Sequence, residues 1–228
     1  MAAAEFDKYA ENYEDILNAS LGASGEGPEF FARYKARYIA RRLSHQFAGK
    51  ILDFGCGIGL LAGFVKEELP RSTVHGYDPS EASIEQVNPA LAAQGRFAAD
   101  LSRLDTDYDA VIVANVLHHI HATGRYQAVK RMVGRMKPGA RLIVIEHNPI
   151  NPFTRHVVAT CPFDKGVVLL PRRETVQLAR DARLTIEKAE FIVFFPRPLA
   201  ILRFLEPALS QCPLGAQYAV VGVKNGNA

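Results

Sequence analysis

The sequence predicts a doubly wound α/β fold with a mostly parallel sheet of seven strands. Short runs rich in valine and isoleucine alternate with helical runs from Lys50 onward, and a glycine-rich turn, DFGCGIG, follows the first run directly. Of the 228 residues, 48% are hydrophobic, which is enough for the core of one domain. Strands that are apolar throughout are buried on both faces, as in a parallel sheet covered by helices.

Two helical runs precede the first strand. The segment EFDKYAENYEDILNA places apolar side chains, Tyr9 and Tyr13 among them, at intervals of three or four residues, which is the pattern of an amphipathic helix. The turn LGASGEGP (21–28) ends this run, and EFFARYKARYIARRL (29–43) forms the second. Residues 1–47 are therefore expected to form a helical element ahead of the sheet.

Strands and helices then alternate to the end of the chain. The predicted strands cover residues 50–54, 72–78, 96–100, 108–115, 140–146, 184–195 and 216–224. The predicted helices cover residues 59–69, 80–92, 123–136, 172–182 and 198–210. The connection 147–171 is long for this kind of fold, and long connections commonly carry functional residues. Ligands of such sheets bind outside the carboxyl ends of the strands.

Composition and charge limit the kinds of molecule that this protein is expected to bind. The net charge is +3 and the basic residues are scattered, so nucleic acid is not indicated. Three cysteines without a CxxC pair indicate reduced thiols, a cytoplasmic location and no zinc site. The acidic N-terminus lacks the features of a signal peptide, and the apolar segment 191–205 is interrupted by proline and arginine. We expect a soluble protein with a small-molecule substrate and no transmembrane segment, and leave peripheral membrane contact open.

The glycine turn favours an amino-acid ligand over a diphosphate. Its alternating glycines, which allow positive φ and close approach of a ligand, are Gly55, Gly57 and Gly59. The nicotinamide fingerprint requires glycine at position 60, where this chain has Leu60. The carboxylate of Asp53 repels a diphosphate and attracts an ammonium group. We interpret Cys56, inside the turn, as a small packing residue rather than a nucleophile.

Two further acids follow the next two strands. Asp78, which precedes Pro79, can accept hydrogen bonds from both hydroxyls of a ribose. Asp100 can accept a hydrogen bond from an adenine amino group, with the backbone N–H of Leu101 as a donor beside it. Each acid alone is more often a helix cap or turn residue. Acids at three successive strand ends favour a cationic ligand that carries a nucleoside.

Through LDFGCGIG, GYDPS, AADLSRL and DAVIVANVLHHI, the sequence resembles class I S-adenosylmethionine-dependent methyltransferases over roughly residues 48–147. The resemblance implies a Rossmann-like sheet with an antiparallel last strand and S-adenosyl-L-methionine as cofactor. It also implies a single domain with an N-terminal lid (1–47), a cofactor-binding half (48–147) and a substrate-side segment with the closing strands (148–228).

The resemblance implies a set of cofactor contacts along the chain. The segment from Asp53 to Gly59, with Cys56, would hold the methionine part, and Asn115 would lie near the sulfonium. Asp78 and Pro79 would lie at the ribose, and Asp100 and Leu101 at the adenine. A tyrosine of the lid, Tyr9 or Tyr13, would contact the cofactor and help to exclude water.

Three histidines follow the fourth and fifth strands and are candidate catalytic bases. They are His118, His119 and His147. A neutral imidazole, with a pKa of about 6.5, can take a proton from a hydroxyl or an amine. Resemblance to small-molecule methyltransferases favours His118, while the alternative is that one of the adjacent pair caps or packs beneath a helix. Glu146 is a weaker candidate. Lys35 and Arg37 either pair with the cofactor carboxylate or lie on a solvated helix face.

The sequence thus predicts methyl transfer from S-adenosylmethionine to oxygen or nitrogen of a small molecule, by in-line displacement and without a metal. Basic and apolar residues between 147 and 171 suit a sugar, phosphorylated or lipid-linked acceptor. The apolar tail near 194–218 either contributes to such an entrance or builds the core around the last strands. The alternatives are a nicotinamide-dependent oxidoreductase and a module that binds the cofactor without catalysis.

Overall fold

A seven-stranded sheet forms the centre of the structure, a computed structural model that describes residues 25–226. The strands are β1 (Lys50–Phe54), β2 (Thr73–Tyr77), β3 (Phe97–Ala98), β4 (Tyr108–Ala114), β5 (Met136–His147), β6 (Leu184–Ile192) and β7 (Gln217–Lys224). Their order is β3-β2-β1-β4-β5-β7-β6. β7 runs antiparallel to both β5 and β6, and the other pairs are parallel. The predicted sheet with an antiparallel last strand is confirmed.

Helices cover both faces of this sheet. The α-helices are α3 (Pro28–Leu43), α4 (Leu60–Glu68), α5 (Glu81–Glu85), α6 (Pro89–Ala92), α7 (Ala122–Gly134), α8 (Pro152–Thr160) and α9 (Arg172–Asp181). Short 3-10 segments are η3 (Leu101–Arg103), η4 (Leu117–His119), η5 (Pro162–Asp164) and η6 (Arg197–Leu209). The first expected helix, with Tyr9 and Tyr13, lies outside the described residues.

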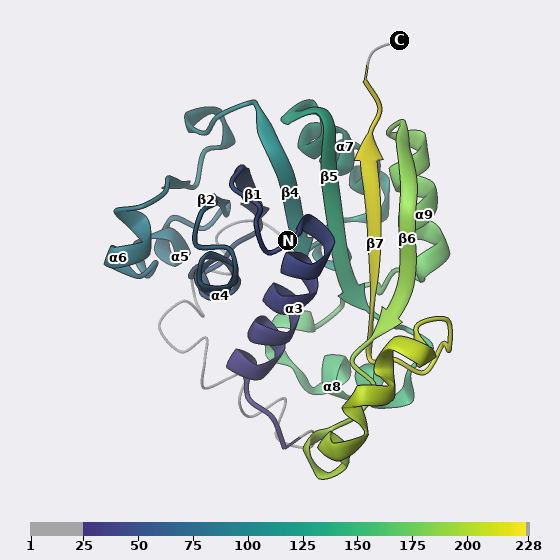
Figure 1. Ribbon diagram of the computed structural model, residues 1–228. Coiled ribbons are helices and arrows are strands. Elements are labelled where there is room, and N and C mark those ends of the chain that lie inside the picture. The colour runs from purple at the N-terminus through teal and green to yellow at the C-terminus, as the bar shows by residue number, and fades with distance from the viewer. Residues whose placement is uncertain (1–24, 227–228) are drawn as a thin grey trace.

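Alternate residues of a strand point to opposite faces, so each strand contributes to two cores. In β5, Ile143 and Ile145 pack with α3 and α4, whereas Leu142 and Val144 pack with α7 and α9. Figure 1 shows α3 in front of the sheet and α7 on its far side. This double burial explains why the strands read as continuous apolar runs.

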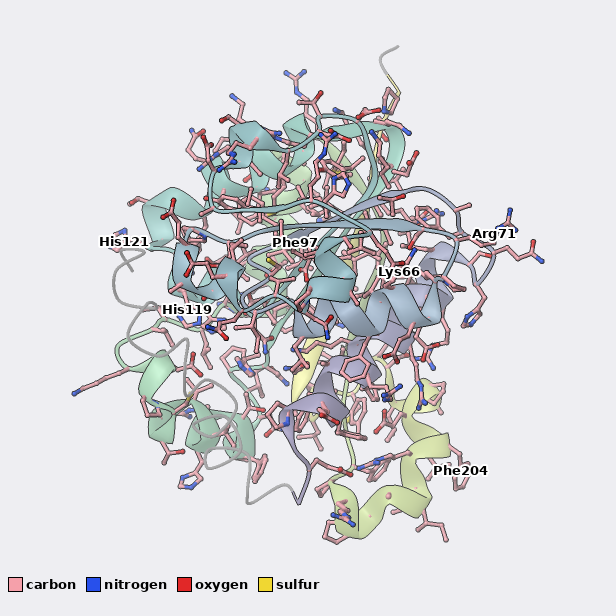
Figure 2. All side chains as sticks on the ribbon, turned by 90° about the vertical axis from the view of Figure 1, so that its left-hand side faces the viewer. Lys66, Arg71, Phe97, His119, His121 and Phe204 are labelled. Carbon is pink, nitrogen blue, oxygen red and sulfur yellow. The ribbon has the colours of Figure 1, made fainter. Side chains whose placement is uncertain are left out.

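Two predicted helices differ from expectation. The helix expected at 80–92 is split into α5 and α6, because Pro89 cannot continue a helix and Asn88 caps the second piece through its side chain. The tail is only partly core: Tyr218 is buried, whereas Ile201 and Leu205 of η6 are exposed, as is Phe204, whose exposed fraction is 74%. Figure 2 shows Phe204 projecting away from η6. Across residues 25–226, no helix has the length and apolarity to cross a bilayer.

The insertion between β5 and α9 lies at the carboxyl ends of the parallel strands. In Figure 1 these strands point downward and α8 lies beneath them. Asn151 caps α8 by accepting a hydrogen bond from the backbone N–H of Thr154. The buried amide of Asn148 donates to the carbonyl oxygens of Pro213 and Gly215, which ties the insertion to the chain entering β7. The insertion is therefore anchored where ligands of this fold bind.

Arg125 of α7 is a fully buried cation that joins three segments around this edge. Its Nε donates to the carbonyl oxygens of Leu117 (3.2 Å) and Ile120 (3.1 Å). Its Nη atoms reach the carbonyl oxygen of Val168 in the insertion and pair with Glu174 of α9 at 2.8 Å. The guanidinium thus provides hydrogen-bond donors to backbone carbonyl oxygens of the turns at η4 and Val168, where the chain forms no regular helix or strand.

Replacing Arg125 with methionine should destabilise the fold by about 3 kcal/mol. The substitution roughly retains volume but removes the guanidinium donors to the carbonyl oxygens of Ile120 and Val168 and the partner of Glu174, and an acceptor left unsatisfied costs about 1–3 kcal/mol. The measurement is the free energy of unfolding in urea. Lys130→Met, on the exposed face of the same helix, is the matched control and should change stability by less than about 0.5 kcal/mol. Equal effects of the two substitutions would contradict the bridging role.

Candidate functional site

A cavity of about 690 Å³ opens at the carboxyl ends of β1, β2, β4 and β5. One end is formed by the glycine turn after β1, and the other by η4, the end of β5, α8 and η5. Lys35 of α3 contributes to its wall. The cavity is thus where the sequence places the site, at the strand ends of a doubly wound sheet.

The glycine turn brings the backbone of Gly55 and Gly57 to the wall of the cavity. Gly55, Gly57 and Gly59 all have positive φ, at 82°, 52° and 82°. A Cβ on Gly57 would point into open space beside the cavity, and one on Gly55 would lie 2.4 Å from the side chain of Val116. Asp78 holds the turn, since its Oδ2 accepts a hydrogen bond from the N–H of Gly57 at 2.8 Å.

Two buried ionisable groups of opposite sign, Asp53 and Lys35, line the cavity at the end formed by the glycine turn. Asp53 is 1% exposed, and its Oδ2 has no hydrogen-bond partner among the described residues. Burial, and then the nearby Asp78, raise the pKa of Asp53 to about 7 against the lowering effect of Lys35. Burial also lowers the pKa of Lys35 to about 8. Asp53 and Lys35 form no ion pair with each other in the described chain, so each can accept a charged ligand group.

The other predicted cofactor residues differ from one another in whether they line the cavity. Cys56 and Pro79 line the cavity, and burial raises the pKa of the Cys56 thiol, which keeps it neutral. Asp100 is exposed and caps η3 through Ser102, and Leu101 is buried in the core, so neither side chain lines the cavity. Their contacts with adenine stay a prediction. Among the two basic candidates of α3, only Lys35 faces the cavity, because Arg37 pairs with Glu68 at the surface.

Asn115 ends β4 in a conformation that few residues adopt. Its φ is 58°, in the left-handed region, and its backbone N–H donates to the carbonyl oxygen of Ile145. Its side-chain oxygen accepts a hydrogen bond of 3.4 Å from Gln217 of β7, and both residues line the cavity. Gln217 was not predicted from the sequence, because the start of the last strand carries no motif. Strain of this kind is concentrated at functional sites.

The end of the cavity away from the glycine turn holds a histidine–carboxylate cluster, which consists of His118, His119, Glu146, His147 and Asp164. His118 Nδ1 lies 2.6 Å from Glu146 Oε2, and both side chains are 1% exposed. Glu146 Oε1 accepts hydrogen bonds from the backbone N–H groups of Val116 (3.0 Å) and Leu117 (2.6 Å). Glu146 therefore fixes both the ring of His118 and the turn that carries it.

Asp164 of η5 completes the cluster from the insertion. Its Oδ1 lies 3.3 Å from His118 Nε2 and 3.4 Å from His119 Nε2. The rings of His118 and His147 are 5.2 Å apart between their centroids. In Figure 2, His121 lies near the left-hand margin of the molecule and His119 lies farther inward. The structure thus brings all three predicted histidines together and adds a carboxylate that the sequence did not single out as catalytic.

The three histidines differ in charge. Burial lowers the pKa of His118, but the carboxylates of Glu146 and Asp164 outweigh this effect and raise the pKa to about 9. Burial and then the positive charge on His118 lower the pKa of His119 to about 4 and that of His147 to about 3. Near neutral pH, His118 therefore carries a proton, while the other two imidazoles are neutral.

Comparisons with known proteins agree with this architecture. A family model described as a methyltransferase domain matches residues 52–142. A ubiquinone/menaquinone biosynthesis C-methyltransferase UbiE of Syntrophotalea carbinolica is 30% identical over 67% of this chain and 68% of its own length. A second UbiE, of Desulfotalea psychrophila, is 27% identical over 82% of this chain and 74% of its own.

A solved structure of similar fold is the TehB-like SAM-dependent methyltransferase of Corynebacterium glutamicum. It has a TM-score of 0.63 and 21% identity, over 96% of this chain and 99% of that one. The ordered glycine turn, the acids at the strand ends, the antiparallel β7 and these relatives lead to one conclusion. The chain belongs to the class I methyltransferases, enzymes whose methyl donor is S-adenosylmethionine.

Proposed function

We propose that this enzyme methylates an oxygen or nitrogen of a small molecule that must first lose a proton. The observation that carries this proposal is that one cavity joins the glycine turn to the histidine–carboxylate cluster. A donor bound at the turn and an acceptor bound at the cluster would meet without crossing bulk water. Alignment and exclusion of water account for much of the rate enhancement in such a transfer.

The cofactor end fits the methionine part of S-adenosylmethionine. The cofactor supplies an electrophilic methyl group and carries an ammonium and a carboxylate at its amino-acid end. Asp53 Oδ2, which lacks a partner among the described residues, would accept hydrogen bonds from the ammonium, and Lys35 would pair with the carboxylate. The open space at Gly57 admits the ligand against the backbone. Asp78 would hold the ribose, and Asn115 would face the sulfonium.

At the acceptor end, the neutral form of His118 would receive the proton of the acceptor. His118 is protonated while Glu146 and Asp164 flank it, so the acceptor must first displace Asp164, which carries the Nε2 proton away with it. Glu146 binds Nδ1 and leaves Nε2 on the side of Asp164 and the cavity. An acceptor hydroxyl that displaces Asp164 from Nε2 would lie within hydrogen-bond reach of the imidazole, a contact that commonly tightens only in the substrate complex. Phe153 and Val157 of α8 line the same end and would shield the transfer from water.

Carbon methylation is the second candidate, because both curated relatives are named C-methyltransferases. A phenol or enol that loses its hydroxyl proton becomes nucleophilic at oxygen and at a neighbouring carbon, so the same cluster would serve either outcome. A hydroxylated, partly apolar acceptor is compatible with methylation at oxygen and at carbon, and its apolar part would lie against α8. Nicotinamide-dependent oxidation is not supported, since position 60 is leucine and the chain belongs to a methyltransferase family.

The proposal is tested by incubating the purified enzyme with S-adenosylmethionine and four acceptor types: a catechol, a quinol, a primary amine and a sugar phosphate. Formation of S-adenosylhomocysteine is followed by mass spectrometry, and the product is identified by NMR. An O-methyl or N-methyl product supports the proposal, and a C-methyl product selects the second candidate. Binding of S-adenosylhomocysteine without turnover on any acceptor would contradict methylation of these classes.

Changing His118 to alanine should slow turnover by about 10²–10⁴-fold, the range typical of a lost general base. The dissociation constant for S-adenosylhomocysteine, measured by calorimetry, should change by less than about threefold, because His118 lies at the acceptor end. His156→Ala is the control, since His156 is exposed on α8 and does not line the cavity. Weaker cofactor binding with an unchanged turnover number would count against a catalytic role.

Affinity for S-adenosylhomocysteine should fall as the pH falls through 7. Asp53, whose pKa is raised to about 7, must be ionised to pair with the ligand ammonium, and it is protonated in the free enzyme at lower pH. One pKa unit corresponds to about a tenfold effect, so binding at pH 6 should be roughly five- to tenfold weaker than at pH 7.5. Calorimetry at several pH values measures this. The Asp53→Asn variant should bind weakly with a flat profile, whereas an unchanged slope would exclude Asp53 as the origin.

A further inference from the structure

The histidine–carboxylate cluster brings three potential metal ligands together from separate segments. They are His118 of η4, His147 at the end of β5, and Asp164 of η5. One ligand atom from each lies within 4.8 Å of the other two. We propose that this trio binds a divalent transition-metal ion at the acceptor end of the cavity.

The orientation of His118 is the first support. A metal-binding histidine almost always donates its second ring N–H to a carboxylate or carbonyl, which fixes the ring and its tautomer. Glu146 provides this contact at 2.6 Å to Nδ1 and is itself held by two backbone N–H groups. Nε2 is thereby directed at Asp164, without rotation of the ring.

The distances are the second support. His118 Nε2 and Asp164 Oδ1 are 3.3 Å apart, close to the edge of a tetrahedron whose ligands lie about 2.0–2.1 Å from its metal, which is about 3.4 Å. The widest pair in the trio is within 4.8 Å, so it must close by at most roughly 1.4 Å to reach that edge.

The chemistry of the donors indicates the class of ion. Two imidazoles and one carboxylate suit Zn²⁺, Fe²⁺ or Co²⁺, whereas Mg²⁺ and Ca²⁺ prefer oxygen ligands throughout. Three protein ligands leave at least one coordination position open, as in catalytic rather than structural zinc sites. Because His118, His147 and Asp164 all line the cavity, the open position would face the acceptor.

An ion at this place deepens the proposed function and names an oxygen-donor acceptor as its substrate class. The acceptor hydroxyl would bind the open position and release its proton to water, because a divalent ion lowers the pKa of a bound hydroxyl. His118 would then be a ligand instead of the base. This role rests on the proposed methyl transfer, but binding of the ion does not, and the two can be measured separately.

The experiment uses the full untagged chain, treated with a chelator and titrated with Zn²⁺ by calorimetry and with Co²⁺ by visible absorption. We expect one ion per chain. His147→Ala and Asp164→Asn should each weaken binding at least tenfold. His156→Ala, which removes an exposed histidine of α8, is the matched control and should bind like the wild type. Circular dichroism of each variant in chelator establishes that it is folded.

Thermal unfolding gives a second readout that does not depend on turnover. Zn²⁺ should raise the melting temperature of the wild type and of His156→Ala, but not of Asp164→Asn. Absence of binding to the wild type, or equal binding by all variants, would overturn the metal site. An enzyme that binds the ion but methylates none of the acceptors refutes the proposed function alone, and one that binds the ion but turns over fully in excess chelator overturns only the role of the ion in the transfer.

Discussion

The buried carboxylate of Glu146 is the interaction on which the acceptor end depends. A carboxylate removed from water is costly unless charges and hydrogen-bond donors surround it. Here the donors are the backbone N–H groups of Val116 and Leu117 and the ring of His118. Satisfying Glu146 therefore sets the path of the chain after β4 and the orientation of His118 together. Because Glu146 lies in β5, these hydrogen bonds hold the turn that follows the neighbouring strand, β4, in a fixed position relative to β5.

The cavity has two ends of different electrostatic character. At the glycine turn, Asp53 and Lys35 offer opposite charges to a zwitterionic group without neutralising each other by direct contact. At the far end, a protonated imidazole lies between two carboxylates, where a proton or a cation is strongly favoured. Asn115 lies at the junction, and its left-handed backbone turns the chain from β4 into η4. Under the proposed function, this division would give donor and acceptor separate means of recognition within one continuous cavity.

The insertion determines much of the acceptor end. It contributes Asp164 and the apolar wall of α8, and it is connected to α7 through Arg125 and to the entry of β7 through Asn148. The sheet and the glycine turn recur in proteins of similar fold, whereas function is determined by the residues added at the strand ends. The comparisons say more about the identity of the methyl donor than about that of the methyl acceptor, because the family-model match ends at residue 142, before the insertion begins.

The sequence by itself determined the sheet, the glycine turn and the identity of the methyl donor. Periodicity and strand-end positions are local signals, and they correctly placed Asp53, Gly57 and Asn115 beside one cavity. Local signals did not show that Asp100 caps η3 through Ser102, or that apolar residues of η6 face solvent. Only the tertiary structure decided the acceptor end. His118 meets Glu146 across 28 positions and Asp164 across 46, and such contacts depend on the path of an irregular insertion that no periodic pattern encodes.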